Sequence, residues 1–144
     1  MRLERDAMRL GIVASRFNEE LTSRLLERAQ AEAKKLGAQC SVVSVPGALE
    51  IPVALQWLAQ SGRFDALVAV GAVVRGETYH FEIVCNESAR GITEVALECG
   101  LPIANGVLTT NDEKQAEARL DKGAEAVRVA IEMAKLRHRL NEER

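Results

Sequence analysis

The chain has 144 residues, of which 47% are hydrophobic and 28% charged, and its formal net charge is −2. This length and composition fit one compact domain, and the charge gives no reason to expect a nucleic acid or an acidic membrane as partner. No apolar run approaches the roughly 20 residues of a membrane-spanning helix, and the first residues lack the apolar segment of a secretory signal. We therefore expect a cytoplasmic protein.

Apolar runs and helical repeats alternate along the chain. Residues 9–14 predict a strand, and the apolar positions of 20–36 recur every three or four residues, as on one face of a helix that ends at Gly37. Residues 65–74 show no alternation of apolar and polar positions, which is typical of a strand buried on both faces. The other expected elements are strands at 40–45 and 103–108 and helices at 49–59, 81–99, 111–120 and 124–140.

Strands that alternate with helices in this way require parallel pairing and right-handed crossovers. The predicted fold class is α/β, a three-layer α/β/α domain with a four-stranded parallel sheet, flavodoxin-like strand order and helices on both faces. One domain covers residues 1–144, with an N-terminal arm at 1–8 and a solvated tail at 141–144. Ligands bind such sheets at the carboxyl ends of the strands. The loops that follow the carboxyl ends of the four predicted strands are residues 15–18, 46–50, 75–80 and 109–112.

The three cysteines, Cys40, Cys85 and Cys99, are widely spaced. They form neither a C-x-x-C metal pair nor a disulfide framework. We interpret them as small, buried, apolar residues in a reducing compartment.

The loop after the third strand, in the segment VGAVVRGETYHFE, carries the richest chemistry. Gly76, Glu77 and Thr78 precede a helix, and free backbone N–H groups at such a position suit a phosphate. The alternative is an ordinary helix start, with Thr78 as N-cap and Gly76 in the turn. His80 can transfer protons near neutral pH, or it can be a structural residue of the first helical turn.

Three further residues lie in or near the other loops. Glu50 stands between Pro46 and Pro52, where its carboxylate can accept hydrogen bonds from a polyol or an amine; alternatively it is a first-turn helix glutamate. Phe17 offers a flat face to a planar ring or packs against the following helix. Arg119, taken alone, is an ordinary surface arginine.

Five segments, taken together and in order, resemble the lumazine synthase family: SRFNEELTSRLLERA, VPGALEIPVA, GAVVRGETYHFEIVCNE, LPIANGVLT and QAEAR. The resemblance extends from Gly11 to Leu136. The combination of P-G-A-x-E-I-P with R-G-E-T-x-H-F is highly specific. The resemblance implies a transferase of riboflavin biosynthesis.

The implied reaction condenses 5-amino-6-(D-ribitylamino)uracil with 3,4-dihydroxy-2-butanone 4-phosphate. Imine formation, phosphate loss and ring closure give 6,7-dimethyl-8-ribityllumazine, phosphate and water. The resemblance implies no cofactor, neither a metal nor a redox group.

The resemblance also assigns roles to residues. His80 is the catalytic proton-transfer residue, and the phosphate is bound by the N–H groups of Glu77 and Thr78 and by the side chain of Arg119. The pyrimidine and its ribityl chain are bound by Phe17, Asn18, Ala48, Leu49, Glu50, Ala72, Val73, Val74 and Asn105.

The chain departs from the family pattern at two places. Asn105 stands where the family commonly has an aromatic residue, so apolar surface is replaced by hydrogen-bonding groups. The segment RLDKG after Arg119 is several residues shorter than in many members, and Lys122 is the candidate for the basic residue that usually follows.

Two small-molecule substrates are the implied partners, together with other copies of the chain. Family members are homo-oligomers built from pentamers, with active sites between adjacent subunits and with the residues that match Asn105 and Arg119 supplied by the neighbour. The shortened segment lies where shell-forming members join their pentamers, so we expect a free pentamer or decamer. Riboflavin synthase is a further partner consistent with the resemblance, whereas no nucleic acid and no membrane are expected.

Two other functions are alternatives to lumazine synthesis: a scaffold subunit and a flavodoxin-like signalling module. A scaffold subunit without turnover would not need His80, Glu50 and Arg119 together, and all three are present. A flavodoxin-like signalling module would need clustered aspartates after the first strand, where the chain has residues 15–18, SRFN.

Overall fold

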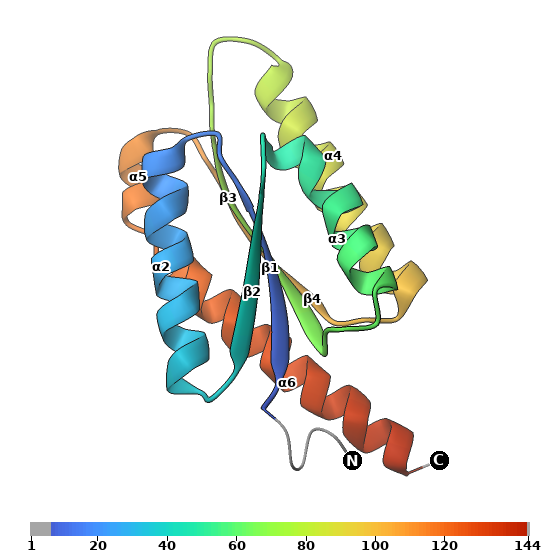
Figure 1. The fold of residues 1–144 in the computed structure, drawn as a ribbon. Coiled ribbons are helices and arrows are strands. Elements are labelled where there is room, and N and C mark those ends of the chain that lie inside the picture. Colours follow the sequence, from blue (N-terminus) through green and yellow to red (C-terminus); the bar gives the residue numbers. More distant parts are fainter. Residues whose placement is uncertain (1–6, 144) are drawn as a thin grey trace.

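The computed structural model describes residues 7–143 and contains a four-stranded parallel sheet between two layers of helices (Figure 1). The strand order is β2-β1-β3-β4 and every neighbouring pair is parallel, so the predicted flavodoxin-like α/β class is confirmed. The elements in chain order are β1 Arg9–Ser15, α2 Glu19–Lys35, β2 Gln39–Val45, the 3₁₀ turn η1 Ala48–Glu50, α3 Ile51–Gln60, β3 Ala66–Val74, α4 His80–Cys99, β4 Ile103–Thr110, α5 Glu113–Glu117 and α6 Lys122–Glu142.

The core is divided by the sheet into two parts. Helices α2 and α6 cover one face and α3 and α4 cover the other (Figure 1). Successive side chains of β1 point to opposite faces of the sheet. Ile12 therefore packs in the part of the core under α2 and α6, and Val13 packs in the part under α3 and α4. The central strand β3 is buried from Ala66 to Val73, as its unbroken apolar sequence predicted.

The two edge strands differ from β3. In β4 buried and more exposed residues largely alternate, and Asn105 is one of the exposed ones. In β2 every residue is exposed or only half-buried, including the apolar pair Val42 and Val43. An edge strand has a neighbour on one side only, and β2 contacts no helix closely except α2.

Gly37 ends α2 as predicted. Its φ of +78° is a left-handed conformation that glycine adopts without strain. The N–H of Gly37 donates to the Lys34 carbonyl at 3.1 Å, and the N–H of Ala38 donates to the Ala33 carbonyl at 2.8 Å. These two bonds form a Schellman motif, which satisfies carbonyls at the end of the helix.

The last two helices begin and end at different residues than predicted. Helix α5 starts only after Asp112, because the Asp112 carboxylate accepts a hydrogen bond from the Gln115 N–H at 2.8 Å and so caps the helix. Helix α6 begins at Lys122 rather than at 124 and approaches α2 closely. A Cβ atom on Gly123 would lie 2.2 Å from the Leu25 carbonyl oxygen, so this contact requires glycine.

The predicted arm and tail are described in part. Met8 packs against the core, while residues 1–6 of the arm lie outside the described residues. Helix α6 continues to Glu142, so residues 141 and 142, which are exposed, belong to the helix, and residue 144 lies outside the described residues. Within residues 7–143 no helix combines the length and the apolar character needed to cross a membrane.

Candidate active site

A pocket of about 370 Å³ opens at the carboxyl ends of β1 and β3, beside η1 and the first turns of α4. It brings together most of the residues predicted for the site: Phe17, Ala48, Leu49, Glu50, Ala72, Val73, Val74, Thr78 and His80. Gly47, Gly76, Phe81 and Val84 also line it. The sequence patterns did not indicate Phe81 and Val84, although Val84 follows His80 by four residues and therefore lies on the same face of α4.

The end of β3 forms one wall of the pocket because β3 extends beyond the last residue that pairs with β1. Pairing with β1 ends at Val70, whereas pairing with β4 continues to Val74. The side chain of Asn18 reaches into this region, and its Nδ2 donates to the Ala72 carbonyl at 2.8 Å. Asn18 therefore shapes the wall without lining the pocket itself.

Asn18 also has an unusual backbone. Its φ of 57° and ψ of 50° are left-handed, and within residues 7–143 no other residue except glycine has a positive φ. Asparagine tolerates this conformation better than most residues. The turn at Asn18 leads β1 into α2 and leaves the preceding Phe17 at the pocket mouth.

Phe17 has a fixed backbone and a free ring. Its N–H donates to the Pro46 carbonyl at 3.1 Å, and its carbonyl accepts from the Thr22 hydroxyl at 3.3 Å. The side chain is nevertheless 69% exposed, so the alternative of a ring packed against the following helix is wrong. An exposed ring on a fixed backbone suits stacking on a planar ligand.

Glu50 lies at the junction of η1 and α3, with Pro52 at the second position of α3. Its carboxylate makes no hydrogen bond or ion pair within residues 7–143 and borders the pocket. Gly47 makes room for it, because a Cβ atom there would meet Glu50 Oε1 at 3.2 Å. Glu50 is therefore available to accept hydrogen bonds from a ligand.

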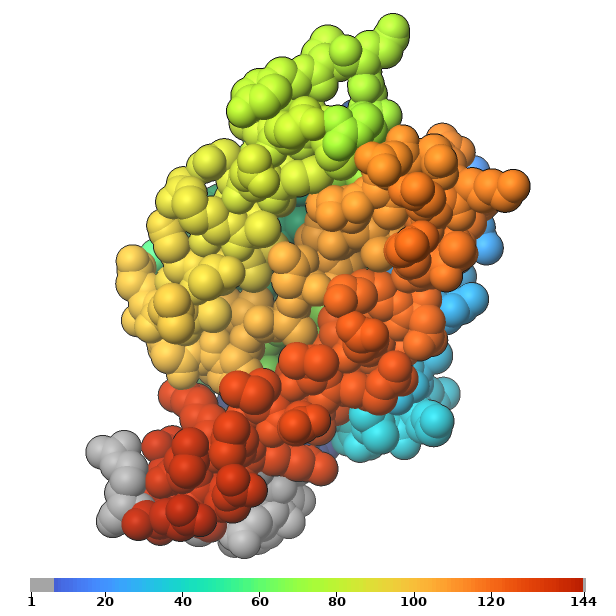
Figure 2. All heavy atoms as spheres, turned by 180° about the vertical axis from the view of Figure 1, so that it is seen from behind, coloured from blue at the N-terminus to red at the C-terminus, as the bar shows by residue number. Residues whose placement is uncertain are grey.

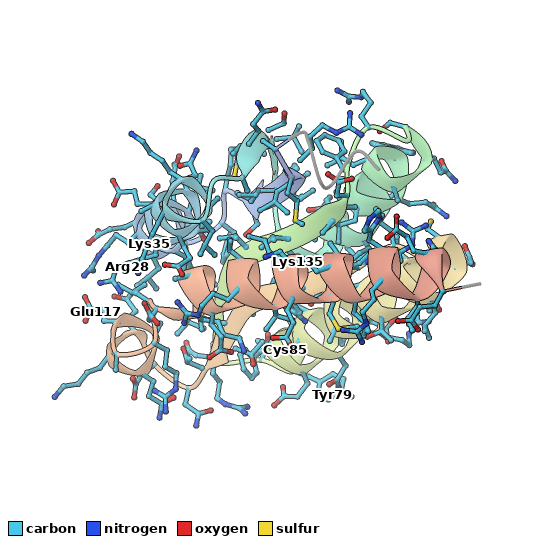
Figure 3. All side chains as sticks on the ribbon, turned by 90° about the horizontal axis from the view of Figure 1, so that it is seen from below. Arg28, Lys35, Tyr79, Cys85, Glu117 and Lys135 are labelled. Atoms are coloured by element: carbon cyan, nitrogen blue, oxygen red, sulfur yellow. The ribbon has the colours of Figure 1, made fainter. Side chains whose placement is uncertain are left out.

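The loop between β3 and α4 leaves backbone donors free. The N–H groups of Gly76, Glu77 and Thr78 make no hydrogen bond within the described part of the chain. Helix α4 begins at His80, so Tyr79 rather than Thr78 occupies the N-cap position, although Thr78 Oγ1 accepts from the His80 N–H at 3.3 Å. The loop projects beyond the sheet in Figure 1, and Tyr79 points outward from the body in Figure 3.

Gly76 is not required by the fold of its own chain. Its φ is not positive, and a Cβ atom there would meet nothing within 4 Å. Glycine at this point instead leaves the backbone open to close approach by another molecule.

Asn105 and Arg119 lie elsewhere, in a second hollow of about 630 Å³ beside β4, α5 and α6. The two hollows share no lining residue. Figure 2 shows this side of the molecule, with β4, α5 and α6 in orange to red next to α4 in yellow. Lys122 lines the second hollow as well and forms an ion pair with Glu125 at 3.0 Å.

The side chains of the second hollow are held in place by their own neighbours. Arg119 Nη1 donates to the Gln115 carbonyl at 2.9 Å, which leaves its other donors free within the described residues. Asn105 Oδ1 accepts from the Val107 N–H at 2.9 Å, so the amide nitrogen remains as a donor.

No group of three or more His, Cys, Asp or Glu side chains within residues 7–143 is arranged to hold a metal ion. The three cysteines are free and half-buried, and burial raises the pKa of the Cys40 and Cys85 thiols above their ordinary value.

Comparison with known proteins places the chain in a family. A family model described as 6,7-dimethyl-8-ribityllumazine synthase matches residues 7–138. The 6,7-dimethyl-8-ribityllumazine synthase of Burkholderia ambifaria (strain MC40-6) is 59% identical over 138 residues, which is 93% of this chain and 81% of that relative. The proteins of the same name from Burkholderia multivorans and Burkholderia vietnamiensis are each 58% identical over 93% of this chain and cover 80% and 82% of those relatives. The chain therefore belongs to the 6,7-dimethyl-8-ribityllumazine synthase family.

Proposed function

We propose that the pocket of Phe17 and His80 is the active site in which this transferase makes 6,7-dimethyl-8-ribityllumazine for riboflavin biosynthesis. Its substrates are 5-amino-6-(D-ribitylamino)uracil and 3,4-dihydroxy-2-butanone 4-phosphate. One observation carries the proposal: Phe17, Glu50 and His80 come from the three segments that follow β1, β2 and β3, and they converge on one pocket.

The pyrimidine binds at the end of the pocket formed by Phe17 and β3. The exposed ring of Phe17 stacks on the heterocycle, and the backbone at Ala72, Val73 and Val74 presents polar groups to its edge. Ala48 and Leu49 border the same space. The free Glu50 carboxylate accepts hydrogen bonds from the ribityl hydroxyls.

The phosphate of the ketone binds at the opposite end, at the loop between β3 and α4. Unpaired N–H groups of Glu77 and Thr78, together with the positive end of the α4 dipole, favour an anion there. The open space at Gly76 allows the phosphate to approach the backbone.

His80 lies between these two ends and makes no side-chain hydrogen bond within residues 7–143. Its imidazole can give and take protons during imine formation and during the elimination of phosphate. Holding both reactants side by side in the pocket contributes much of the rate, because their encounter then becomes effectively intramolecular.

Among the described residues that line the pocket there is no Lys or Arg. Asn105, Arg119 and Lys122 line the separate hollow beside β4. We propose that a neighbouring subunit supplies Asn105 next to the pyrimidine and Arg119 next to the phosphate, with Lys122 close by. The exposure of both residues on one chain supports such a shared site.

The assembly proposed on this basis is a ring of five chains, each a single domain over residues 1–144. The short segment from Arg119 to Gly123 favours a free pentamer or a decamer over a shell, and light scattering that gives the mass of a shell would contradict this. We also propose a cytoplasmic location and riboflavin synthase as the enzyme that receives the product.

A direct assay tests the proposed function. Purified protein mixed with both substrates is expected to produce lumazine absorbance and fluorescence together with inorganic phosphate, and omission of either substrate is expected to abolish the signal. Folded protein that forms no lumazine above the uncatalysed rate would contradict the proposal.

A further inference from the structure

We infer that Arg75 is a positioning residue of the proposed active site, because it ties the first turn of α4, and with it His80, to the ends of β3 and β4. The inference rests on the proposed function of the pocket. Arg75 does not line the pocket itself, so any effect it has on the reaction must act through the residues that it holds.

Arg75 is attached first to the end of β4. Its N–H donates to the Thr110 carbonyl at 2.9 Å and so extends the pairing of β3 with β4 by one residue. Its Nε donates to Asn111 Oδ1, also at 2.9 Å. The backbone and the guanidinium of Arg75 are therefore both attached to the end of β4.

The same guanidinium also holds the helix. Arg75 Nη1 donates to the Glu82 carboxylate, and the guanidinium carbon lies 4.5 Å from the centre of the Phe81 ring. Phe81 and Glu82 directly follow His80 in α4. A planar guanidinium carries donors on different sides, so a single group can bind Asn111 and Glu82 at once.

The electrostatics agree with this geometry. The hydrogen bond from Arg75 holds the pKa of the Glu82 carboxyl below its ordinary value, so the pair is ionised at neutral pH. Cys85, one turn further along α4, also faces this pair, and burial is the main cause of its raised pKa. The cation therefore keeps a charged partner at neutral pH.

The loop that Arg75 spans has few bonds of its own. The described hydrogen bonds of residues 76–79 all go to the first turn of α4: Thr78 Oγ1 accepts from the His80 N–H, and the Tyr79 carbonyl accepts from the Glu82 and Ile83 N–H groups. None of them reaches the sheet. Residues 76–79 are exposed and project beyond the sheet (Figure 1). Without the arginine, little would fix the distance between His80 and the wall formed by β3.

The Arg75 side chain is 46% exposed, and exposed ion pairs contribute little to folding stability. We therefore expect its loss to change the geometry of the site more than the stability of the fold. In Arg75→Met, kcat is expected to fall by up to about 10²-fold, the scale of effect that a small misplacement of reacting groups produces. The KM of the phosphorylated ketone should rise, whereas the KM of the pyrimidine should change less than about twofold, since Phe17 is held by hydrogen bonds in which Arg75 takes no part.

Two companion variants sharpen the test. Arg75→Lys retains the charge but not the planar fork, so an intermediate kcat is expected. Arg90→Met is the matched control, because Arg90 is also an exposed, ion-paired arginine that contacts α4 carboxylates, Glu87 and Glu94, but it does not line the pocket. Its kcat and both KM values should equal those of the wild type.

A wild-type kcat in Arg75→Met would overturn the inference, as would equal rises of both KM values with kcat unchanged. If Arg75→Met does not fold, Asn111→Ala and Glu82→Ala each remove one attachment, and kcat is expected to fall several-fold in both. A wild-type kcat in both of them would overturn the inference equally.

Hydrogen exchange separates this inference from the proposed function. In substrate-free protein, the amides of Glu82 and Ile83, which donate to the Tyr79 carbonyl at 3.0 and 3.3 Å, should exchange about tenfold faster in Arg75→Met. Unchanged exchange would overturn the inference whatever the enzyme does. A wild-type protein that forms no lumazine, together with faster exchange in the variant, would count against the proposed function alone.

Discussion

The pocket of Phe17 and His80 and the hollow beside β4 differ in chemical character. The pocket of Phe17 and His80 consists mostly of apolar side chains and backbone, with one free carboxylate at Glu50. The hollow beside β4 is rich in charged groups, including Arg119 and Lys122. A flat heterocycle and a phosphate need both kinds of surface, and neither of these two hollows offers both by itself.

The largest expected effect tests the chemistry of the first hollow. His80→Ala should lower kcat by about 10- to 10⁴-fold, the range for lost acid–base assistance. Steady-state kinetics with both substrates at saturation measure it. The other histidine, His138, lies on α6 outside the pocket, so His138→Ala is the matched control and should retain the wild-type kcat. An unchanged kcat in His80→Ala would remove this role from the residue.

Mixed oligomers test whether the two hollows meet across a subunit boundary. With the phosphorylated ketone well below its wild-type KM, co-expressed His80→Ala and Arg119→Ala subunits should regain about a quarter of the wild-type activity, because about one boundary in four in a random ring pairs an intact His80 with an intact Arg119. Each variant expressed alone is the control. If the mixture is no more active than the two variants measured separately, the shared site is contradicted.

Loss of the Arg119 cation should weaken the binding of the phosphorylated ketone but not that of the pyrimidine. Arg119→Ala is expected to raise the KM of the phosphorylated ketone by roughly 10- to 10²-fold, which corresponds to a lost hydrogen bond between charged groups. The KM of the pyrimidine should change little. Arg139→Ala is the control, since Arg139 is an exposed arginine near the end of α6 and lines neither hollow. Equal changes for both substrates would separate Arg119 from the phosphate.

Loss of the Phe17 ring at the pocket mouth should weaken the binding of the pyrimidine. Phe17→Ala is expected to weaken pyrimidine binding by roughly tenfold, as expected for the loss of stacking on a planar base. Calorimetry with the pyrimidine alone measures this. Trp57→Ala removes an aromatic ring that is 65% exposed on α3 and does not line the pocket, so its pyrimidine affinity should match the wild type. An unaltered affinity in Phe17→Ala would exclude stacking.

The smallest expected effect concerns Gly76. Because the added methyl group meets nothing within 4 Å, Gly76→Ala should fold normally and melt at the wild-type temperature or slightly above it. The KM of the phosphorylated ketone should rise a few-fold, since the methyl group occupies the side from which the phosphate approaches. A lower melting temperature with an unchanged KM would show that the glycine serves the fold instead.

Local sequence signals were reliable where the local chain determines the structure. The Schellman end of α2 at Gly37 follows from the conformational freedom of glycine, and the burial of β3 follows from its unbroken apolar sequence. The start of α5 was misjudged because capping by Asp112 depends on a side-chain bond that apolar periodicity does not report. The start of α6 was misjudged because its close packing on Leu25 involves a helix far away in the sequence.

The alternation of strands and helices, the loops that carry chemistry and, through its motifs, the family can all be read from the amino-acid sequence. Which of these segments meet depends on the folded chain, in which Phe17, Glu50 and His80 line one pocket while Asn105 and Arg119 line another. The folded chain also gives Arg75 its attachments to Asn111 and Glu82. The physical reason is that periodicity and turn preferences act over a few residues, whereas convergence of loops depends on strand order and on where each strand stops pairing.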